Sequence, residues 1–138
     1  MKLTTRYIGI SEAMSIDGRQ ALTLTNFDPT HLGFASFPIT WPITILAIFE
    51  GTEVSGEAPG SPFTGQISVV DPSGQSAFAS PLAGATQDRP FTDLPPRFLF
   101  GTTVALNLAE PGDYRVEVSL TYQGETITGE RPIYIRKV

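Results

Sequence analysis

Cysteine is missing from the 138-residue chain, and histidine occurs once, as His31. Without cysteine the protein forms no disulfide bond and has no thiolate for metal binding or nucleophilic catalysis. A single imidazole excludes a metal site built from several histidines of one chain. A membrane-spanning helix needs about 18 consecutive apolar residues, whereas the most apolar stretch extends only from Ile43 to Phe49. We therefore expect no metal, no cofactor and no membrane as partner.

Basic residues are fewer than acidic ones, nine against fourteen, so the net charge is −5 at pH 7. A net anion is repelled by nucleic acid, which we therefore exclude as a partner. Lys2 and Arg6 stand near the start, but only the short apolar segment Tyr7 to Ile10 follows before Ser11 and Glu12. A secretory signal needs an apolar run of roughly 7–15 residues at this place. We expect a cytoplasmic protein.

Segments long enough for helices are scarce, because thirteen glycines and twelve prolines interrupt the chain. Where apolar residues recur regularly they recur at every second position, which is typical of half-buried strands. The segment from Tyr114 to Tyr122 is the clearest case. We expect strands at or near residues 3–10, 14–16, 20–27, 43–49, 67–69, 98–108, 114–122 and 127–135.

Turn sequences separate these segments. Asp17-Gly18 and Gln123-Gly124 predict hairpins, since glycine adopts positive φ angles without strain. Asp71-Pro72-Ser73-Gly74 predicts a type I turn.

Pairing outward from Gln123-Gly124 would turn one charged residue toward the core. It places Leu120 opposite Ile127 and makes Arg131 face inward. We expect a β-bulge at residues 129–132 to resolve the conflict, because a proline at position 132 cannot donate to a ladder.

A corner motif follows the predicted strand 98–108. Pro111, Gly112 and Tyr114 resemble the E–F corner of immunoglobulin-like domains, where a tyrosine packs inward and its hydroxyl bonds to upstream backbone. We assign these three residues a structural role. The strands and turns together predict an all-β fold, namely a single antiparallel, immunoglobulin-like β-sandwich of about seven to eight strands that occupies residues 1–138 as one domain.

No constellation of residues predicts catalysis. Residues 51–63 and 79–97 are rich in glycine, proline and carboxylates and are expected to be loops, but they lack the Asp-x-Asp-x-Asp run of a calcium loop. His31 stands in a turn sequence, and residues 74–78, the segment nearest to a nucleophile elbow, lack the second glycine. We expect a protein that is not an enzyme.

Aromatic residues crowd between positions 27 and 41. Phe34, Phe37 and Trp41 could stack on sugar rings, as in a carbohydrate-binding module, or could close an end of the core. The second interpretation is the more common one for such rings.

The predicted strand 43–49 is apolar on both faces. If one face fills the core, Leu46 and Ile48 face outward. Two explanations remain open. An intermolecular contact could cover these side chains, or one of the two long loops could fold over them.

The chain resembles a family of small cytoplasmic bacterial proteins of immunoglobulin-like fold. The resemblance covers nearly the full length of the chain, and four segments mark it: Ala13–Arg19, Pro42–Glu50, Pro111–Val118 and Tyr122–Glu125. It implies a fold but no activity, ligand or functional residue, because none is established for that family.

These observations favour a non-enzymatic protein that acts through protein contacts, as a subunit or adaptor of an assembly or as a homo-oligomer. The expected interface comprises Leu46, Ile48, Phe34, Phe37 and Trp41. The alternative is a carbohydrate or small-ligand binding module that uses Trp41, Phe34 and Phe37 together with Glu53 or Glu57.

Overall fold

The computed structural model describes residues 3–16, 18, 21–26, 28–52, 62–85 and 93–138. Every regular element in this part of the chain is a strand, which confirms the predicted all-β fold. The ten strands are β1 Leu3–Ser11, β2 Ala13–Ile16, β3 Leu22–Thr25, β4 His31–Phe34, β5 Ile39–Gly51, β6 Pro62–Val70, β7 Ser76–Ala85, β8 Arg97–Leu108, β9 Gly112–Tyr122 and β10 Glu125–Lys137.

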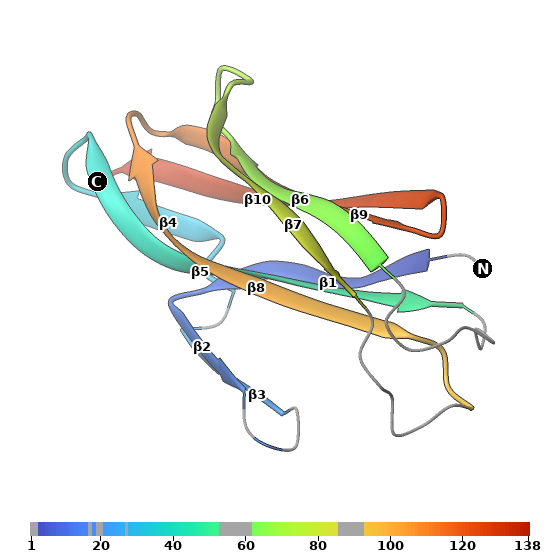
Figure 1. Ribbon diagram of the computed structural model, residues 1–138. Helices are drawn as coiled ribbons and strands as arrows, with labels where there is room; N and C mark the ends of the chain where they lie inside the picture. Colours follow the sequence, from blue (N-terminus) through green and yellow to red (C-terminus); the bar gives the residue numbers. More distant parts are fainter. Residues whose placement is uncertain (1–2, 17, 19–20, 27, 53–61, 86–92) are drawn as a thin grey trace.

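Eight of these strands form two sheets (Figure 1). Their orders are β1-β5-β8 and β4-β10-β9-β6-β7, while β2 and β3 form a separate hairpin. All paired strands are antiparallel except β4 and β10. The β2–β3 hairpin extends from the side of the three-stranded sheet that faces away from the five-stranded sheet (Figure 1).

One hydrophobic core lies between the two sheets, and strands of both contribute to it. Because side chains alternate between the faces of a strand, β9 buries every second residue from Tyr114 to Tyr122 and directs its charged residues outward. The core comprises Leu3, Ile8, Ile10, Trp41, Ile43, Ile45, Ala47, Phe49, Ile67, Val69, Phe98, Leu106, Leu108, Tyr114, Val116, Val118, Leu120, Tyr122, Ile133 and Ile135.

The described chain has ten strands rather than the predicted seven to eight, and two of them occupy segments that the sequence predicted to be irregular. His31 begins β4 rather than lying in a turn, and β7 fills the first part of the predicted loop 79–97. Both are edge strands, which need backbone hydrogen bonds on one side only, so β7 tolerates Pro81. Residues 53–61 and 86–92 of the predicted loops lie outside the described residues.

The predicted pairing of the last two strands is confirmed, but the predicted bulge is wrong. Leu120 pairs with Ile127, and the register continues without a shift through Arg131 opposite Val116. Arg131 does turn inward, and its guanidinium donates to Asp28 Oδ2. A distant carboxylate thus satisfies the inward charge, and the ladder remains regular.

Backbone geometry confirms two of the predicted turns. Gln123 and Gly124 have φ angles of 53° and 76°, the two positive values that a two-residue hairpin of type I′ requires. In the turn after β6, Asp71 Oδ1 accepts hydrogen bonds from Ser73 N at 2.9 Å and Gln75 N at 3.0 Å. A hydrogen bond from the Ser73 hydroxyl is the main reason why the pKa of Asp71 is lowered.

The predicted tyrosine corner is present. Tyr114 Oη donates to the backbone oxygen of Glu110 at 2.7 Å, and the Tyr114 side chain is buried. Burial raises the pKa of Tyr114, so the hydroxyl keeps its proton at neutral pH. Gly112 has a φ of 149° and lies so close to Pro72 that a Cβ atom would collide with the proline ring. The corner is therefore packed against the Asp71 turn.

We predict that Tyr114→Phe lowers the free energy of unfolding by about 1 kcal/mol, because it removes one intramolecular hydrogen bond and leaves the ring packing intact. Urea denaturation at pH 7 measures the change. Tyr134→Phe is the matched control, since no hydrogen bond of the Tyr134 hydroxyl is found within the described residues, and it should change stability by less than about 0.5 kcal/mol. Equal effects of the two substitutions would contradict the assigned role.

Candidate functional site

Leu46 and Ile48 lie on the outer face of the three-stranded sheet, where their neighbours determine how far each side chain is exposed. Leu46 is flanked in register by Gly9 on β1 and Gly101 on β8. A Cβ atom at Gly9 would collide with the Tyr7 hydroxyl, and one at Gly101 would lie 2.6 Å from Met14 Cε. The two glycines therefore make room for Tyr7 and Met14 on either side of Leu46.

Leu46 is covered within the chain. Its residue exposure is 2 %, and the cover comes from Tyr7 and from Met14 of the β2–β3 hairpin. Leu46 faces outward from the core, as predicted, and its cover in the described chain comes from these two side chains; residues 53–61 and 86–92 of the two long loops lie outside the described residues. Leu46 is therefore a packing residue of the described chain rather than a free contact residue.

The next row of the same face is less completely covered. Ile48 pairs with Tyr7 on one side and with Leu99 on the other, and all three side chains are half-buried. We name Tyr7, Ile48 and Leu99 the contact row. At one end of this face, Arg6, displaced by a bulge in β1, forms an ion pair of 3.0 Å with Glu50. The contact row is thus an apolar strip beside a charged border.

On the other side of Leu46 the face is polar and closed. Ser11 and Thr44 are almost completely buried, and Ser11 Oγ donates to the backbone oxygen of Ala13 at 2.9 Å. The hydroxyl oxygens of Thr44 and Thr103 are 3.1 Å apart. Hydrogen bonds satisfy the hydroxyl groups of this row beneath the base of the hairpin.

The aromatic residues that the sequence singled out lie at one end of the core. Trp41 is 7 % exposed, and Phe34 and Phe37 pack against the core. The ring centroids of Phe34 and Trp41 are 6.1 Å apart, and those of Phe34 and Phe37 are 6.2 Å apart, both in edge-to-face geometry. The rings thus close the core, as the more common interpretation of the sequence predicted.

A second aromatic cluster, which the sequence analysis missed, lies in the core elsewhere. Phe63 of β6 packs against Phe98 and Phe100 of β8 at centroid distances of 5.5 and 5.8 Å. Phe98 in turn contacts Tyr122 of β9 at 4.8 Å. The cluster joins strands of both sheets, which are distant in sequence.

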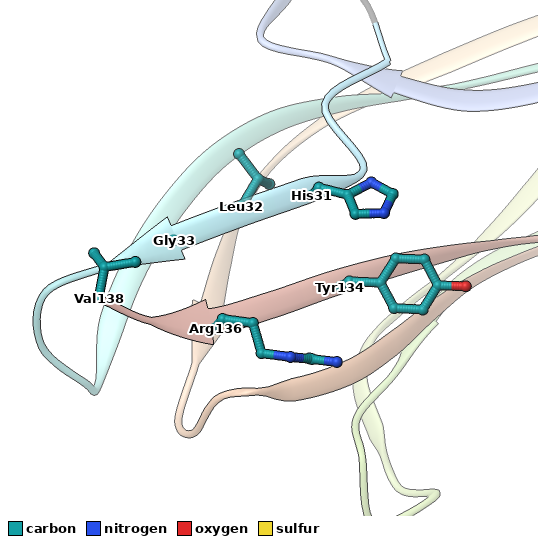
Figure 2. A pocket seen from close by; sticks show the side chains of 6 residues that line it. All are labelled: His31, Leu32, Gly33, Tyr134, Arg136 and Val138. Carbon is teal, nitrogen blue, oxygen red and sulfur yellow. The ribbon is translucent and has the colours of Figure 1, made fainter.

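A hollow of about 550 Å³ lies over β4 and β10 and is lined by His31, Leu32, Gly33, Tyr134, Arg136 and Val138. Figure 2 shows the His31 and Tyr134 rings close together on the neighbouring strands, and their centroids are 5.0 Å apart. The Arg136 guanidinium lies 2.8 Å from Asp113, so this carboxylate already balances its charge. The hollow therefore offers apolar and aromatic surface but no unbalanced charge for an ionic ligand.

A polar cluster of Tyr7, Asp28 and Arg131 lies at the margin of the core. The side chains of Arg131 and Asp28 are 34 % and 23 % exposed. Asp28 is held in place because its backbone N–H donates to the oxygen of Ile10 at 2.8 Å. Burial raises the pKa of Tyr7, the Asp28 carboxylate adds to this rise, and Arg131 opposes it. The cluster fixes the segment between β3 and β4 against β10.

Within the described residues no three histidine, aspartate or glutamate side chains gather closely enough to hold a metal ion. The same part of the chain contains no helix long and apolar enough to cross a membrane. Comparison of the chain with known protein families, with curated proteins and with solved structures finds no match.

Some of these features were visible in the sequence and others were not. The alternation of apolar residues on the last strand predicted that the charged Arg131 faces inward. This conflict correctly pointed to the place where the polar cluster lies. Nothing local identified Asp28 as the partner, since 103 positions separate the two residues. The hollow depends on the parallel pairing of β4 with β10, which no turn sequence indicates.

We predict that Leu46→Ala lowers the free energy of unfolding by about 2–4 kcal/mol, because it leaves a cavity between Tyr7 and Met14. Ile48→Ala on the same strand should cost about 1 kcal/mol, since its side chain is only half-buried. Chemical denaturation of the two variants tests the difference. A larger loss for Ile48→Ala would contradict the assignment of Leu46 to intramolecular packing.

We predict that Arg131→Met lowers the free energy of unfolding by about 1–3 kcal/mol, because the largely buried Asp28 carboxylate loses its cation. Combining it with Asp28→Asn should cost less than the sum of the two single changes, which urea denaturation of all four proteins measures. Arg115→Met, at an exposed ion pair with Glu117, serves as the control and should leave stability nearly unchanged. Strict additivity at positions 28 and 131 would refute the coupling.

Proposed function

We propose that this protein is an immunoglobulin-like β-sandwich that acts through protein contacts and carries out no catalysis. The fold part of the proposal is supported by the strand orders. In chain order, with the β2–β3 hairpin and β4 left aside, we assign β1, β5 and β8 to strands A, B and E. Strands β6, β7, β9 and β10 take the places of C, C′, F and G. The hydrogen bond of Tyr114 to Glu110 is a further immunoglobulin-like feature.

The functional part of the proposal rests on the contact row. The β2–β3 hairpin covers Leu46, but it leaves Tyr7, Ile48 and Leu99 only half-buried beside one another on the outer face. Adjoining apolar side chains of this kind are a feature of surfaces that bind other proteins. The neighbouring Arg6–Glu50 pair supplies the polar rim that such surfaces have. We propose that a protein partner covers the contact row.

The alternative, a carbohydrate or small-ligand binding module, has less support. It needs ring faces that are open to a ligand, whereas Trp41 is 7 % exposed and Phe34 and Phe37 pack against the core. Glu53 and Glu57 lie outside the described residues. Of the interface that the sequence predicted, Ile48 is therefore the residue that we retain, and Tyr7 and Leu99 join it.

The proposal predicts that Ile48→Glu weakens binding of the co-purifying protein partner at least about tenfold, because it places a charge at the centre of an apolar contact. Affinity is measured by calorimetry, and circular dichroism verifies the fold. Leu99→Glu should also weaken binding. Agreement of the two variants would show that the loss in Ile48→Glu does not come from a folding defect at position 48. Thr128→Glu, on the outer face of β10, is the matched control and should bind as the parent protein does.

Two results would overturn this function. One is a parent protein that neither purifies with a stoichiometric partner nor self-associates through the contact row. The other is a partner that binds the Ile48→Glu, Leu99→Glu and parent proteins with equal affinity.

A further inference from the structure

Strand β8 has an unusually unprotected edge. Within the part of the chain that the structure describes, β8 has a hydrogen-bonded neighbour on one side only, which is β5. The pairing with β5 is regular from Arg97 to Leu108. Between these two residues β8 contains no proline and no charged side chain. On the free side, the alternate backbone N–H and C=O groups that point away from β5 form a ready template for another strand.

The other sheet edges carry features that discourage strand pairing. In β1 the register shifts at Arg6, which places a charge on that edge. Strand β7 contains Pro81 and a register shift near Ala77. Strand β4 has only four residues. Short strands, bulges, prolines and edge charges are the usual protection against edge-to-edge association, and β8 has none of them between Phe98 and Leu108.

The ends of β8 carry opposite charges. Arg97 begins the strand and Glu110 follows its end, and both residues are exposed. No ion pair of either side chain is found among the described residues. In an antiparallel pair of identical strands the start of one strand lies beside the end of the other. A second copy of β8 would therefore bring Arg97 of each copy to Glu110 of the other, twice in one symmetric contact.

We propose that β8 pairs antiparallel with β8 of a second copy of this chain, which joins the two three-stranded sheets into one continuous sheet across a two-fold axis. A second copy is favoured over an unrelated strand because the charge pattern of this edge is complementary to itself. This inference goes beyond the contact row, which lies on the face of the sheet rather than at its edge.

Side-chain alternation restricts the register. Residues that oppose each other in an antiparallel pair point to the same face, so only a register that pairs like faces is allowed. Two allowed registers leave one strand residue unpaired, and the one that brings the end charges closer places Thr103 opposite Thr103 of the second copy. Arg97 then faces Ala109, next to Glu110. On the core side, the half-buried Thr102 and Val104 face each other across the axis.

The absence of native cysteine makes this register testable by cross-linking. Opposed Cα atoms in an antiparallel pair are about 4.5–5.5 Å apart, within the range that a disulfide spans. Thr103→Cys should thus form a disulfide-linked dimer under mild oxidation at micromolar protein concentration. Ala105→Cys is the matched control on the same face and edge. In this register, position 105 of one chain lies four residues, or about 13 Å, from position 105 of the second copy. The Ala105→Cys variant should therefore remain mostly monomeric.

Charge reversal tests the same contact in the protein without cysteine. Arg97→Glu and Glu110→Arg should each raise the dimer dissociation constant about tenfold, because each creates two like-charge contacts. The double variant should return to near the parent value. Sedimentation velocity over a concentration series measures the constants, and circular dichroism verifies the fold of each variant.

A parent protein that stays monomeric throughout the series, or cross-linking of Ala105→Cys equal to that of Thr103→Cys, would overturn the inference. A dimer whose dissociation constant is changed by neither charge reversal would overturn it as well. A dimer that is lost in Ile48→Glu and unaffected by the charge reversals would assign self-association to the contact row instead. Partner binding by a strictly monomeric protein would refute the β8 pairing and leave the proposed function intact.

Discussion

Strand β5 is apolar on both faces, and most of the structure around it follows from the need to cover both. Its inward residues from Ile43 to Phe49 fill the space between the sheets. Its outward residue Leu46 would expose a full leucine side chain on the central strand of a three-stranded sheet, at a cost of about 1.5–3 kcal/mol. The β2–β3 hairpin, inserted between β1 and β4, and the ring of Tyr7 supply the missing cover. Ile48, the next outward residue, remains half-buried.

The pair formed by Arg131 and Asp28 has a comparable role at the margin of the core. An inward arginine on β10 interrupts the apolar alternation, and burial of its charge without a partner would be costly. The segment between β3 and β4 supplies the carboxylate, and the backbone hydrogen bond from Asp28 to Ile10 ties this segment to β1. Asp28 thus connects the hairpin insertion to both sheets, through the ion pair to β10 and the backbone hydrogen bond to β1.

Both interaction surfaces inferred here arise from incomplete cover. On the face, Ile48 is only half-buried, and at the edge β8 has β5 as its one hydrogen-bonded neighbour in the described chain. A three-stranded sheet opposite a five-stranded one has a central strand with two paired sides, while each outer strand keeps a free side. Bulges, proline and shortness limit pairing at the other edges, so the remaining surface for contact concentrates around β5 and β8.

Period-two alternation and turn chemistry, which depend on residues close together in the chain, allowed the sequence by itself to determine the all-β class. They also determined the hairpin at Gln123-Gly124, the Asp71 turn and the corner at Tyr114. Tertiary structure alone decided that Leu46 is covered, that Trp41 belongs to the core and that Asp28 reaches Arg131. The physical reason is that burial and charge pairing depend on which distant strands become neighbours, and no local pattern encodes the position of a side chain a hundred residues away.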